Sequence, residues 1–159
     1  MLFRSSMDPG SIGAIVSAVG SLITTSYKAG LGCKSLSEKY KDAPTAIALL
    51  EVECQTTQTT LAYIRECLHS HSASLSRRLA GPPNPFSELI HVALTGSAGA
   101  FGMLEGQVRT IYASETVTHD YTFQRRVQVI WNERSLTDLL ERMKNVKSTL
   151  SLLLNVIQT

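Results

Sequence analysis

The sequence predicts an all-α protein, an antiparallel bundle of four long helices with a short extra helix near residues 123–131. Apolar residues recur at spacings of three, four and seven along four long segments, as in helices that bury one face. No segment alternates apolar and polar residues for long, so strands are not expected. The 159 residues, 43% of them hydrophobic, suffice for one self-sufficient core, and residues 1–159 are therefore expected to form a single domain.

The first helix is expected to follow Asp8–Pro9, an N-cap residue with a proline at the first helical position. Gly30 and Gly32 are expected to fray or end it, so that the charged stretch Lys34–Lys41 leads away. Its apolar stripe is Ile12, Ile15, Val16, Val19, Leu22, Ile23 and Tyr27. The opposite side carries small residues that would permit close approach of another helix: Gly13, Ser17 and Ser21.

Two segments, Pro9–Tyr27 and Leu89–Leu104, carry no charged residue. A membrane-spanning helix needs about 20 predominantly apolar residues, and the first segment is borderline in length and diluted by Gly and Ser. It is not expected to be a signal peptide, because Asp8–Pro9–Gly10 interrupts the apolar run. Two compatible interpretations stay open: a helix buried in the resting bundle, and a segment that moves into lipid on a signal.

The second helix is expected to begin at Asp42–Ala43–Pro44. Its apolar residues repeat every seven positions, the spacing of helices packed at a shallow angle. One column is Ile47, Cys54, Leu61 and Leu68, and the other is Leu50, Thr57 and Ile64. The pattern fades into the polar stretch 69–74 and the basic pair Arg77–Arg78, and Gly81–Pro85 is the strongest loop signal in the chain.

Asn84–Pro85 caps the third helix. One face of it is expected to carry Phe86, Ile90, Ala93, Ser97, Phe101, Leu104, Val108 and Ile111. Four glycines lie within this helix, and each costs about 1 kcal/mol relative to alanine. They are Gly96, Gly99, Gly102 and Gly106. Their frequency indicates either tight packing of a neighbour or a built-in weakness, and residues 113–119 are expected to form a loop.

The last segment has two parts. Val127, Ile130 and Trp131 form a short amphipathic turn, and Ser135–Asp138 resembles a capping box. Two heptad columns then continue to the C-terminus: Leu136, Met143, Leu150 and Ile157, with Leu139, Val146 and Leu153. Because the helix runs to Thr159 without a stop signal, the chain is expected to be part of a longer protein. The residues expected at the centre of the core are Leu50, Leu61, Ile64, Phe101, Trp131, Leu139, Met143, Val146, Leu150 and Leu153.

The inventory of reactive side chains favours neither an enzyme nor a cofactor site. The three cysteines (Cys33, Cys54 and Cys67) are few and odd in number, which is typical of reduced, buried thiols in an intracellular protein. On a helix Cys67 and His71 share a face while His69 points elsewhere, so no zinc site is expected. No phosphate-binding loop or catalytic motif occurs.

The charge balance does not favour a nucleic-acid partner, because 15 basic side chains stand against 13 acidic ones. Two short basic clusters are either solvated surface or contacts to anionic lipid headgroups, worth about 1 kcal/mol per residue near a membrane. Their residues are Arg77, Arg78, Arg125 and Arg126.

The segment from Met7 to Ile23, MDPGSIGAIVSAVGSLI, resembles the opening motif of fungal HeLo-like N-terminal domains. Lys41–Pro44 is similar to the start of that family's second helix. The tail from Trp131 through Leu139 to Leu154 is similar to its closing pattern. The resemblance covers nearly the whole chain from Met7 and depends on helical patterning and a short motif; the six residues before Met7 depart from it.

The resemblance implies an N-terminal effector domain of a fungal NOD-like (STAND) receptor, followed in the same chain by a nucleotide-binding oligomerisation domain. Related HeLo domains execute regulated cell death in heterokaryon incompatibility by exposing an N-terminal hydrophobic segment to the plasma membrane. They resemble the four-helix killer domain of animal mixed-lineage kinase-like proteins. The implied location is the cytoplasm, with recruitment to the plasma membrane on activation.

Two functions follow as hypotheses. In the first, the domain forms homo-oligomers and targets membrane lipids through its first helix. The inserting residues would then be Ile12, Ile15, Val16, Val19, Leu22 and Ile23. In the alternative, the bundle is a signalling adaptor that self-associates or docks a partner without a lipid step.

Overall fold

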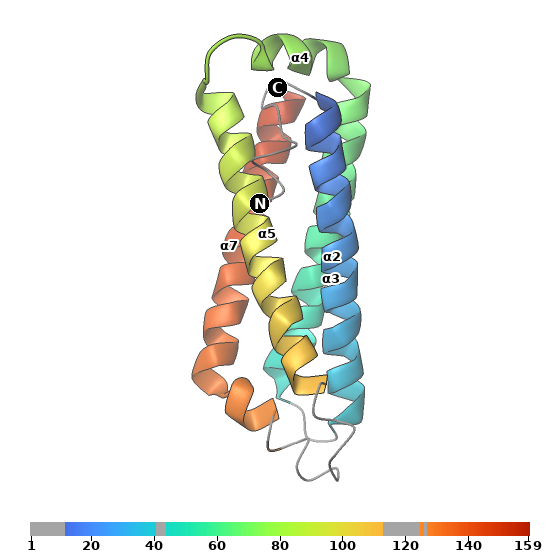
Figure 1. Cartoon of the computed structure of the whole chain (residues 1–159), viewed down its shortest axis with the longest axis vertical. Coiled ribbons are helices and arrows are strands. Elements are labelled where there is room, and N and C mark those ends of the chain that lie inside the picture. Colours follow the sequence, from blue (N-terminus) through green and yellow to red (C-terminus); the bar gives the residue numbers. More distant parts are fainter. Residues whose placement is uncertain (1–11, 41–43, 113–124, 126) are drawn as a thin grey trace.

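The structure is a computed structural model that describes residues 12–40, 44–112, 125 and 127–159. Four long helices run antiparallel along its length: α2 (Ile12–Lys39), α3 (Thr45–Ser70), α5 (Pro85–Tyr112) and α7 (Glu133–Gln158) (Figure 1). Residues 125 and 127–130 are helical as well, and the described part of the chain contains no strand. The expected all-α bundle of four long helices is confirmed.

The four helices form a ring in which each packs against two others. Helix α2 contacts α3 and α5, and α7 contacts the same two helices, so that α3 and α5 stand at opposite corners. The chain leaves α3 and must cross the end of the bundle to begin α5. A further helix, α4 (Ser72–Leu79), makes this crossing, where the sequence indicated only a fading polar stretch (Figure 1). Its Leu75 and Leu79, one turn apart, are buried against the bundle.

The core follows the heptad columns expected from the sequence. Every residue of the two columns in α3 and the two columns in α7 is buried. All eight residues expected on the inner face of α5 are buried too, together with Leu94 and Ala100. Trp131 is 2% exposed, and its Nε1 donates a hydrogen bond to Gln107 Oε1 at 2.6 Å. All ten residues expected at the centre of the core are confirmed there.

Helix α2 does not end at its glycines. It continues to Lys39, so residues 34–39 belong to the helix rather than leading away from it. Gly30 is buried and Gly32 half-buried, and at both positions α2 lies close to a neighbouring helix. A Cβ at Gly32 would lie 2.7 Å from Val108 Cγ1 on α5, and one at Gly30 would lie 3.4 Å from Cys54 Cβ on α3. The expectation that they end the helix was wrong, since close packing between helices outweighs glycine's low helix propensity here.

The helix starts agree with the sequence in part. Ser87 N donates to Asn84 Oδ1 at 3.0 Å, so Asn84 caps α5 as expected, with Pro85 at the first helical position. Pro44 precedes α3, whereas residues 42 and 43 lie outside the described residues. Helix α7 begins three residues earlier than the expected capping box, because Asn132 is the N-cap and its side chain accepts from Ser135 N at 2.9 Å. The expected starts at 8–9 and loop at 113–119 lie outside the described residues.

Candidate functional site

The inner face of the first half of α2 belongs to the hydrophobic core. Ile15, Val19 and Leu22 are 2%, 0% and 4% exposed. Ile12, Val16 and Ile23 are half-buried and pack against the same core. Tyr27, which the sequence placed on this stripe, is instead 51% exposed. The six candidate insertion residues therefore line one face that is covered by the bundle, and the buried face continues along α2 through Ala29, Cys33 and Leu36 without Tyr27.

The outer face of the same segment is exposed and uncharged. Gly13, Ser17 and Ser21 are all exposed, so no helix of the described part of the chain packs against them. These small residues leave α2 two-sided: an apolar stripe turned to the core and a neutral, smooth face turned outward. Because this outer face carries no charged side chain, it has no charge–water interactions to lose when it leaves water.

The uncharged segments of all four helices lie at one end of the bundle. Besides the first half of α2, from Ile12 to Tyr27, they are residues 54–64 of α3, 89–104 of α5 and 148–158 of α7. The antiparallel arrangement brings them side by side near α4, where α2 and α5 begin and α3 and α7 end (Figure 1). We call this region, defined by those four ranges, the neutral belt. Within these four ranges no aspartate, glutamate, lysine or arginine occurs, and the charged residues nearest to α4 are Arg65, Glu66 and Glu88.

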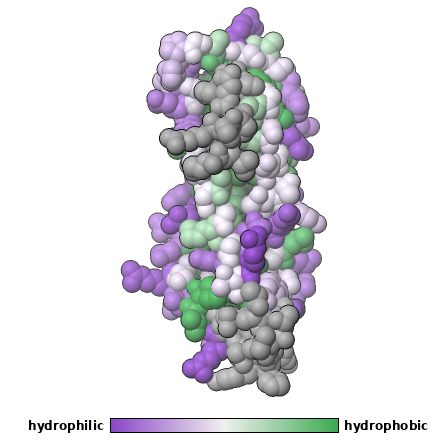
Figure 2. Space-filling view, viewed as in Figure 1, coloured by the Kyte–Doolittle hydropathy of each residue, from purple (hydrophilic) through white to green (hydrophobic). Residues whose placement is uncertain are grey.

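The surface of the neutral belt is polar without being charged. In Figure 2 the visible centre of the bundle is mostly white to pale green, and the deeper purple lies mostly along its sides. Many threonine hydroxyls there donate to backbone carbonyls one turn earlier, as Thr56 does to Val52 O at 2.9 Å and Thr60 to Thr56 O at 3.0 Å. Thr25 bonds Ser21 O in the same way, at 3.0 Å. A hydroxyl satisfied by its own helix loses less on leaving water than one that needs a water partner.

Three of the four glycines of α5 lie on this surface, and Gly106 lies two residues beyond it. Gly96, Gly99, Gly102 and Gly106 are exposed, and a Cβ added at any of them would meet nothing within 4 Å. The expectation of a tightly packed neighbour is therefore not met within the described part of the chain. These glycines lower the intrinsic helix propensity of α5 without easing any contact in the bundle.

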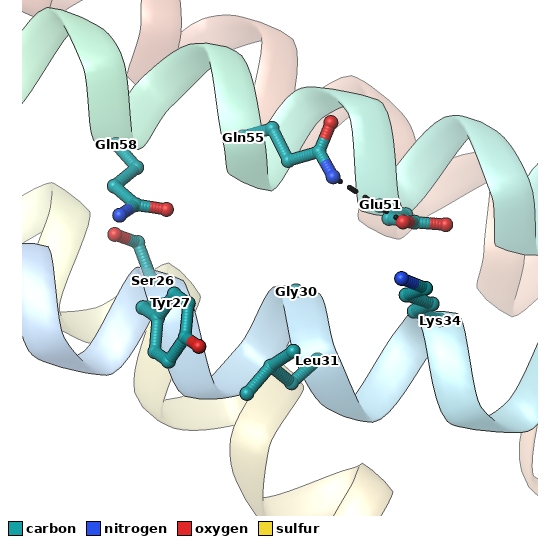
Figure 3. Close-up of a pocket in the computed structure, with 8 residues that line it drawn as sticks. All are labelled: Ser26, Tyr27, Gly30, Leu31, Lys34, Glu51, Gln55 and Gln58. Atoms are coloured by element: carbon teal, nitrogen blue, oxygen red, sulfur yellow. Dashed lines mark hydrogen bonds between the residues drawn. The ribbon is translucent and has the colours of Figure 1, made fainter.

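A shallow groove of about 170 Å³ lies between α2 and α3. Tyr27, Leu31 and Lys34 line it from α2, and Glu51 and Gln55 line it from α3, with Gly30 at the middle of the α2 side (Figure 3). Gln55 Nε2 donates to Glu51 Oε1 at 3.3 Å within α3. Tyr27 and Leu31, 51% and 47% exposed, were missed as surface residues because the helical period alone does not show where the contact with α3 ends.

The basic candidates do not form one surface. Arg77 is exposed on α4. Arg78 is half-buried: its guanidinium lies 4.0 Å from the centre of the Phe86 ring, and its Nη1 donates to Val156 O at 3.1 Å. Arg78 thus ties α4 to the start of α5 and the end of α7. Arg125 is exposed on the short helical segment at the opposite end of the bundle (Figure 1), and Arg126 lies outside the described residues.

The polar cluster at the end of α3 does not gather into a metal site. His69 and His71 are exposed, and His71 N donates to Cys67 O as the helix closes. Cys67 Sγ lies 4.0 Å from Gln158 Nε2, at the end of α7. Among the residues that the structure describes, no three histidine, cysteine or carboxylate side chains are grouped as metal ligands.

No described helix contains a stretch long and apolar enough to cross a bilayer. Comparison of the chain with protein-family models, with curated protein sequences and with solved structures finds no match.

Proposed function

We propose that this chain is a membrane-targeting effector domain of the HeLo-like class, which acts by oligomerising and releasing α2 onto a lipid surface. The observation that carries the proposal is the two-sided first half of α2. Its apolar stripe, with Ile15, Val19 and Leu22 at most 4% exposed, is held in the core, while no residue from Ile12 to Tyr27 is charged. A helix of this kind is covered at rest and needs no charge desolvation when it moves.

The energetics support a triggered movement. Burying a large aliphatic side chain is worth about 1.5–3 kcal/mol, so exposing Ile15, Val19 and Leu22 to water is strongly unfavourable. Release becomes favourable only where another apolar phase or another copy of the chain covers the stripe and the opened core. Clustering of several copies on a membrane supplies both at once.

The mode of membrane contact that we propose is interfacial. No described helix is long and apolar enough to span, but an amphipathic helix lies in the interface with its apolar face about 5–10 Å into the headgroup–acyl boundary. The exposed side of the remaining neutral belt, where the hydroxyls of Thr56 and Thr60 bond their own helix, would follow α2 to the surface at little cost. Arg77, exposed on α4, would contact anionic headgroups at this end of the bundle.

The resemblance of the opening and closing segments supports the wider context. We propose that the chain precedes a nucleotide-binding receptor domain in a longer cytoplasmic protein, and that receptor assembly at the plasma membrane clusters it for regulated cell death.

A pair of adjacent substitutions tests the proposal. Val16 is half-buried on the apolar stripe, and Ser17 is exposed on the outer face. The chain, clustered through an oligomeric C-terminal tag, is added to anionic liposomes that contain a self-quenching dye. Val16→Glu should reduce dye release at least tenfold, whereas Ser17→Glu, with the same charge one residue on, should retain most of it. Circular dichroism confirms that both variants remain folded. Equal release by the two variants, or none by the wild type, would contradict insertion of the stripe.

An adaptor that self-associates without lipid is the second candidate, and the exposed glycines of α5 favour it. Gly96 and Gly99 leave open space on a helix surface, which allows a helix of another molecule to approach closely. Sedimentation of the clustered and unclustered chain in the absence of lipid discriminates the two functions. The adaptor function would be favoured if the wild type formed defined oligomers that the Gly99→Leu variant does not form. It would also require that the wild type release no dye from liposomes.

A further inference from the structure

Two cysteines face one another across the most extensive helix contact of the bundle, the contact between α2 and α3. Cys33 comes from α2 and Cys54 from α3, and both are 0% exposed. The Cys54 side chain acts directly on the Cys33 thiol and raises its pKa. Gly30, one turn before Cys33, brings the two helices together, because a Cβ there would lie 3.4 Å from Cys54 Cβ. Disulfides need this kind of approach, since the Cα atoms they join lie about 4.4–6.8 Å apart.

The groove between α2 and α3 lies beside this pair. Gly30 lines the groove and also lies against Cys54, so only a residue without a side chain separates the two at that point (Figure 3). A volume of about 170 Å³ is ample for a molecule the size of hydrogen peroxide, given that a water molecule occupies about 30 Å³. Cys67, the third cysteine, lies at the far end of α3 and takes no part.

We propose that Cys33 and Cys54 are a redox-sensitive dithiol that a peroxide converts into a disulfide tying α2 to α3. In the first step one thiolate sulfur attacks a peroxide oxygen; the O–O bond breaks and a sulfenic acid and water result. In the second step the other thiol sulfur attacks the sulfenic sulfur, the S–S bond forms and a second water leaves. Two thiols are oxidised and one hydrogen peroxide is reduced to two waters.

The resting pair should react slowly rather than instantly. The Cys54 side chain and burial both raise the pKa of the Cys33 thiol, and the thiolate is the reactive form. The pair is therefore expected to become oxidised only under sustained exposure to peroxide or when the α2–α3 contact loosens. This behaviour distinguishes the pair from an exposed, low-pKa sensor cysteine.

The consequence for activity rests on the proposed function. Helix α2 is continuous from Ile12 to Lys39, so its first half can leave the bundle as part of the whole helix only if Cys33 separates from Cys54. The disulfide would then lock the domain in its resting state, and reduction would restore its ability to respond to clustering.

Peptide mapping of the folded wild-type chain tests the disulfide itself. Trypsin cleaves after Lys34, Lys39 and Lys41, which lie between the two cysteines, and places Cys67 in a third peptide. After peroxide treatment, thiol blocking and digestion, residues 29–34 and 42–65 should appear as one linked species that dithiothreitol separates. The melting temperature of the oxidised protein should rise by roughly 5–10 °C. Cys67→Ser should behave as the wild type, and Cys33→Ala should show neither change.

The Gly30→Ala variant tests whether peroxide reaches the two cysteines through the groove between α2 and α3. Its methyl group fits at ordinary contact distance from Cys54, so the protein should fold, while the linked species should form several times more slowly. Absence of the linked species from folded wild-type protein, with Cys33 or Cys54 unmodified or oxidised singly, would overturn the proposal. So would a link that forms only in urea.

Dye release separates this inference from the proposed function. If the wild type releases dye, its oxidised form should release at least fivefold less until it is reduced, and unchanged release would overturn the lock. If the reduced wild type releases none, the membrane function fails, while the mapped disulfide and the melting temperature still decide whether the dithiol responds to peroxide.

Discussion

Gly32 of α2 and Val108 of α5 lie so close that a Cβ on the glycine would be 2.7 Å from Val108 Cγ1. Real Cβ atoms do not approach a methyl carbon this closely, and valine is stiff at χ1, so an alanine at this position must push α2 and α5 apart or strain the valine. The contact fixes the α2–α5 distance in the half of the bundle away from α4.

We predict that Gly32→Ala destabilises the protein by up to about 2 kcal/mol. Overpacking of a core costs about 1–3 kcal/mol, and the better helix propensity of alanine returns only about 1 kcal/mol. Gly99→Ala, where the methyl group meets nothing within 4 Å, should instead stabilise by about 0.5–1 kcal/mol. Urea unfolding of both variants measures the difference, and an equal stabilisation would refute the close approach at Gly32.

Thr57 should be replaceable by valine with a gain in stability. The residue is 0% exposed, and its Oγ1 has no hydrogen-bond partner among the residues that the structure describes. Valine has nearly the same shape and removes the unpaired hydroxyl, whose burial costs about 1–3 kcal/mol. Thr57→Val should therefore raise the free energy of unfolding by about 1 kcal/mol.

The neighbouring Thr56 provides the control, because it is exposed and its hydroxyl bonds Val52 O. Thr56→Val should change the free energy of unfolding by less than about 0.5 kcal/mol, the range of ordinary surface substitutions. If Thr57→Val destabilises while the control does not, the buried hydroxyl has a partner in solution.

The start of α7 can be tested by exchanging two residues that the sequence and the structure assign differently. Asn132 accepts a hydrogen bond from Ser135 N through its side chain. Asn132→Ala should cost about 0.5–2 kcal/mol, since it removes an N-cap. Ser135→Ala keeps the backbone N–H that is bonded and should cost less than about 0.5 kcal/mol. If Ser135→Ala lowered the melting temperature more than Asn132→Ala, Ser135 and not Asn132 would be the N-cap.

Alkaline pH should destabilise the wild type more than Cys33→Ala. The Cys54 side chain and burial raise the pKa of Cys33 above its ordinary value of 9.0. The folded state therefore keeps a proton that the unfolded state releases, so this stabilisation is complete below pH 9 and decreases as the pH rises further. The wild type should lose up to about 1.4 kcal/mol per pH unit more than the variant above that point. Parallel urea titrations at several pH values, with a reductant present, measure the difference.

The helical faces of this protein could be read from sequence because they depend on local periodicity. The heptad columns of α3 and α7 required only that residues such as Ile64 and Leu150 recur at seven positions, and both are fully buried. The six residues from Ile12 to Ile23 on α2 were found on the covered side for the same reason. Whether this face inserts into lipid stays a prediction, because insertion would occur in an activated state that differs from the resting bundle.

The glycines could not be interpreted in the same way. Gly30 and Gly32 have the local properties of a helix end, and Gly96 and Gly99 those of a packed stripe, yet each pair has the opposite role. A glycine has no side chain whose periodicity reveals a partner. Only the positions of the neighbouring helices decide whether its missing Cβ makes room for a contact or leaves open surface.

The amino-acid sequence by itself determined the all-α class, the inward faces and the absence of charge in two segments, because these follow from residue type and helical spacing. The ring order of the helices was decided only in three dimensions, and with it the meeting of Cys33 with Cys54, the gathering of four uncharged segments near α4 and the use of Arg78 as an internal tie. Contacts between residues far apart in the chain depend on which helix lies beside which. Local periodicity does not contain that information.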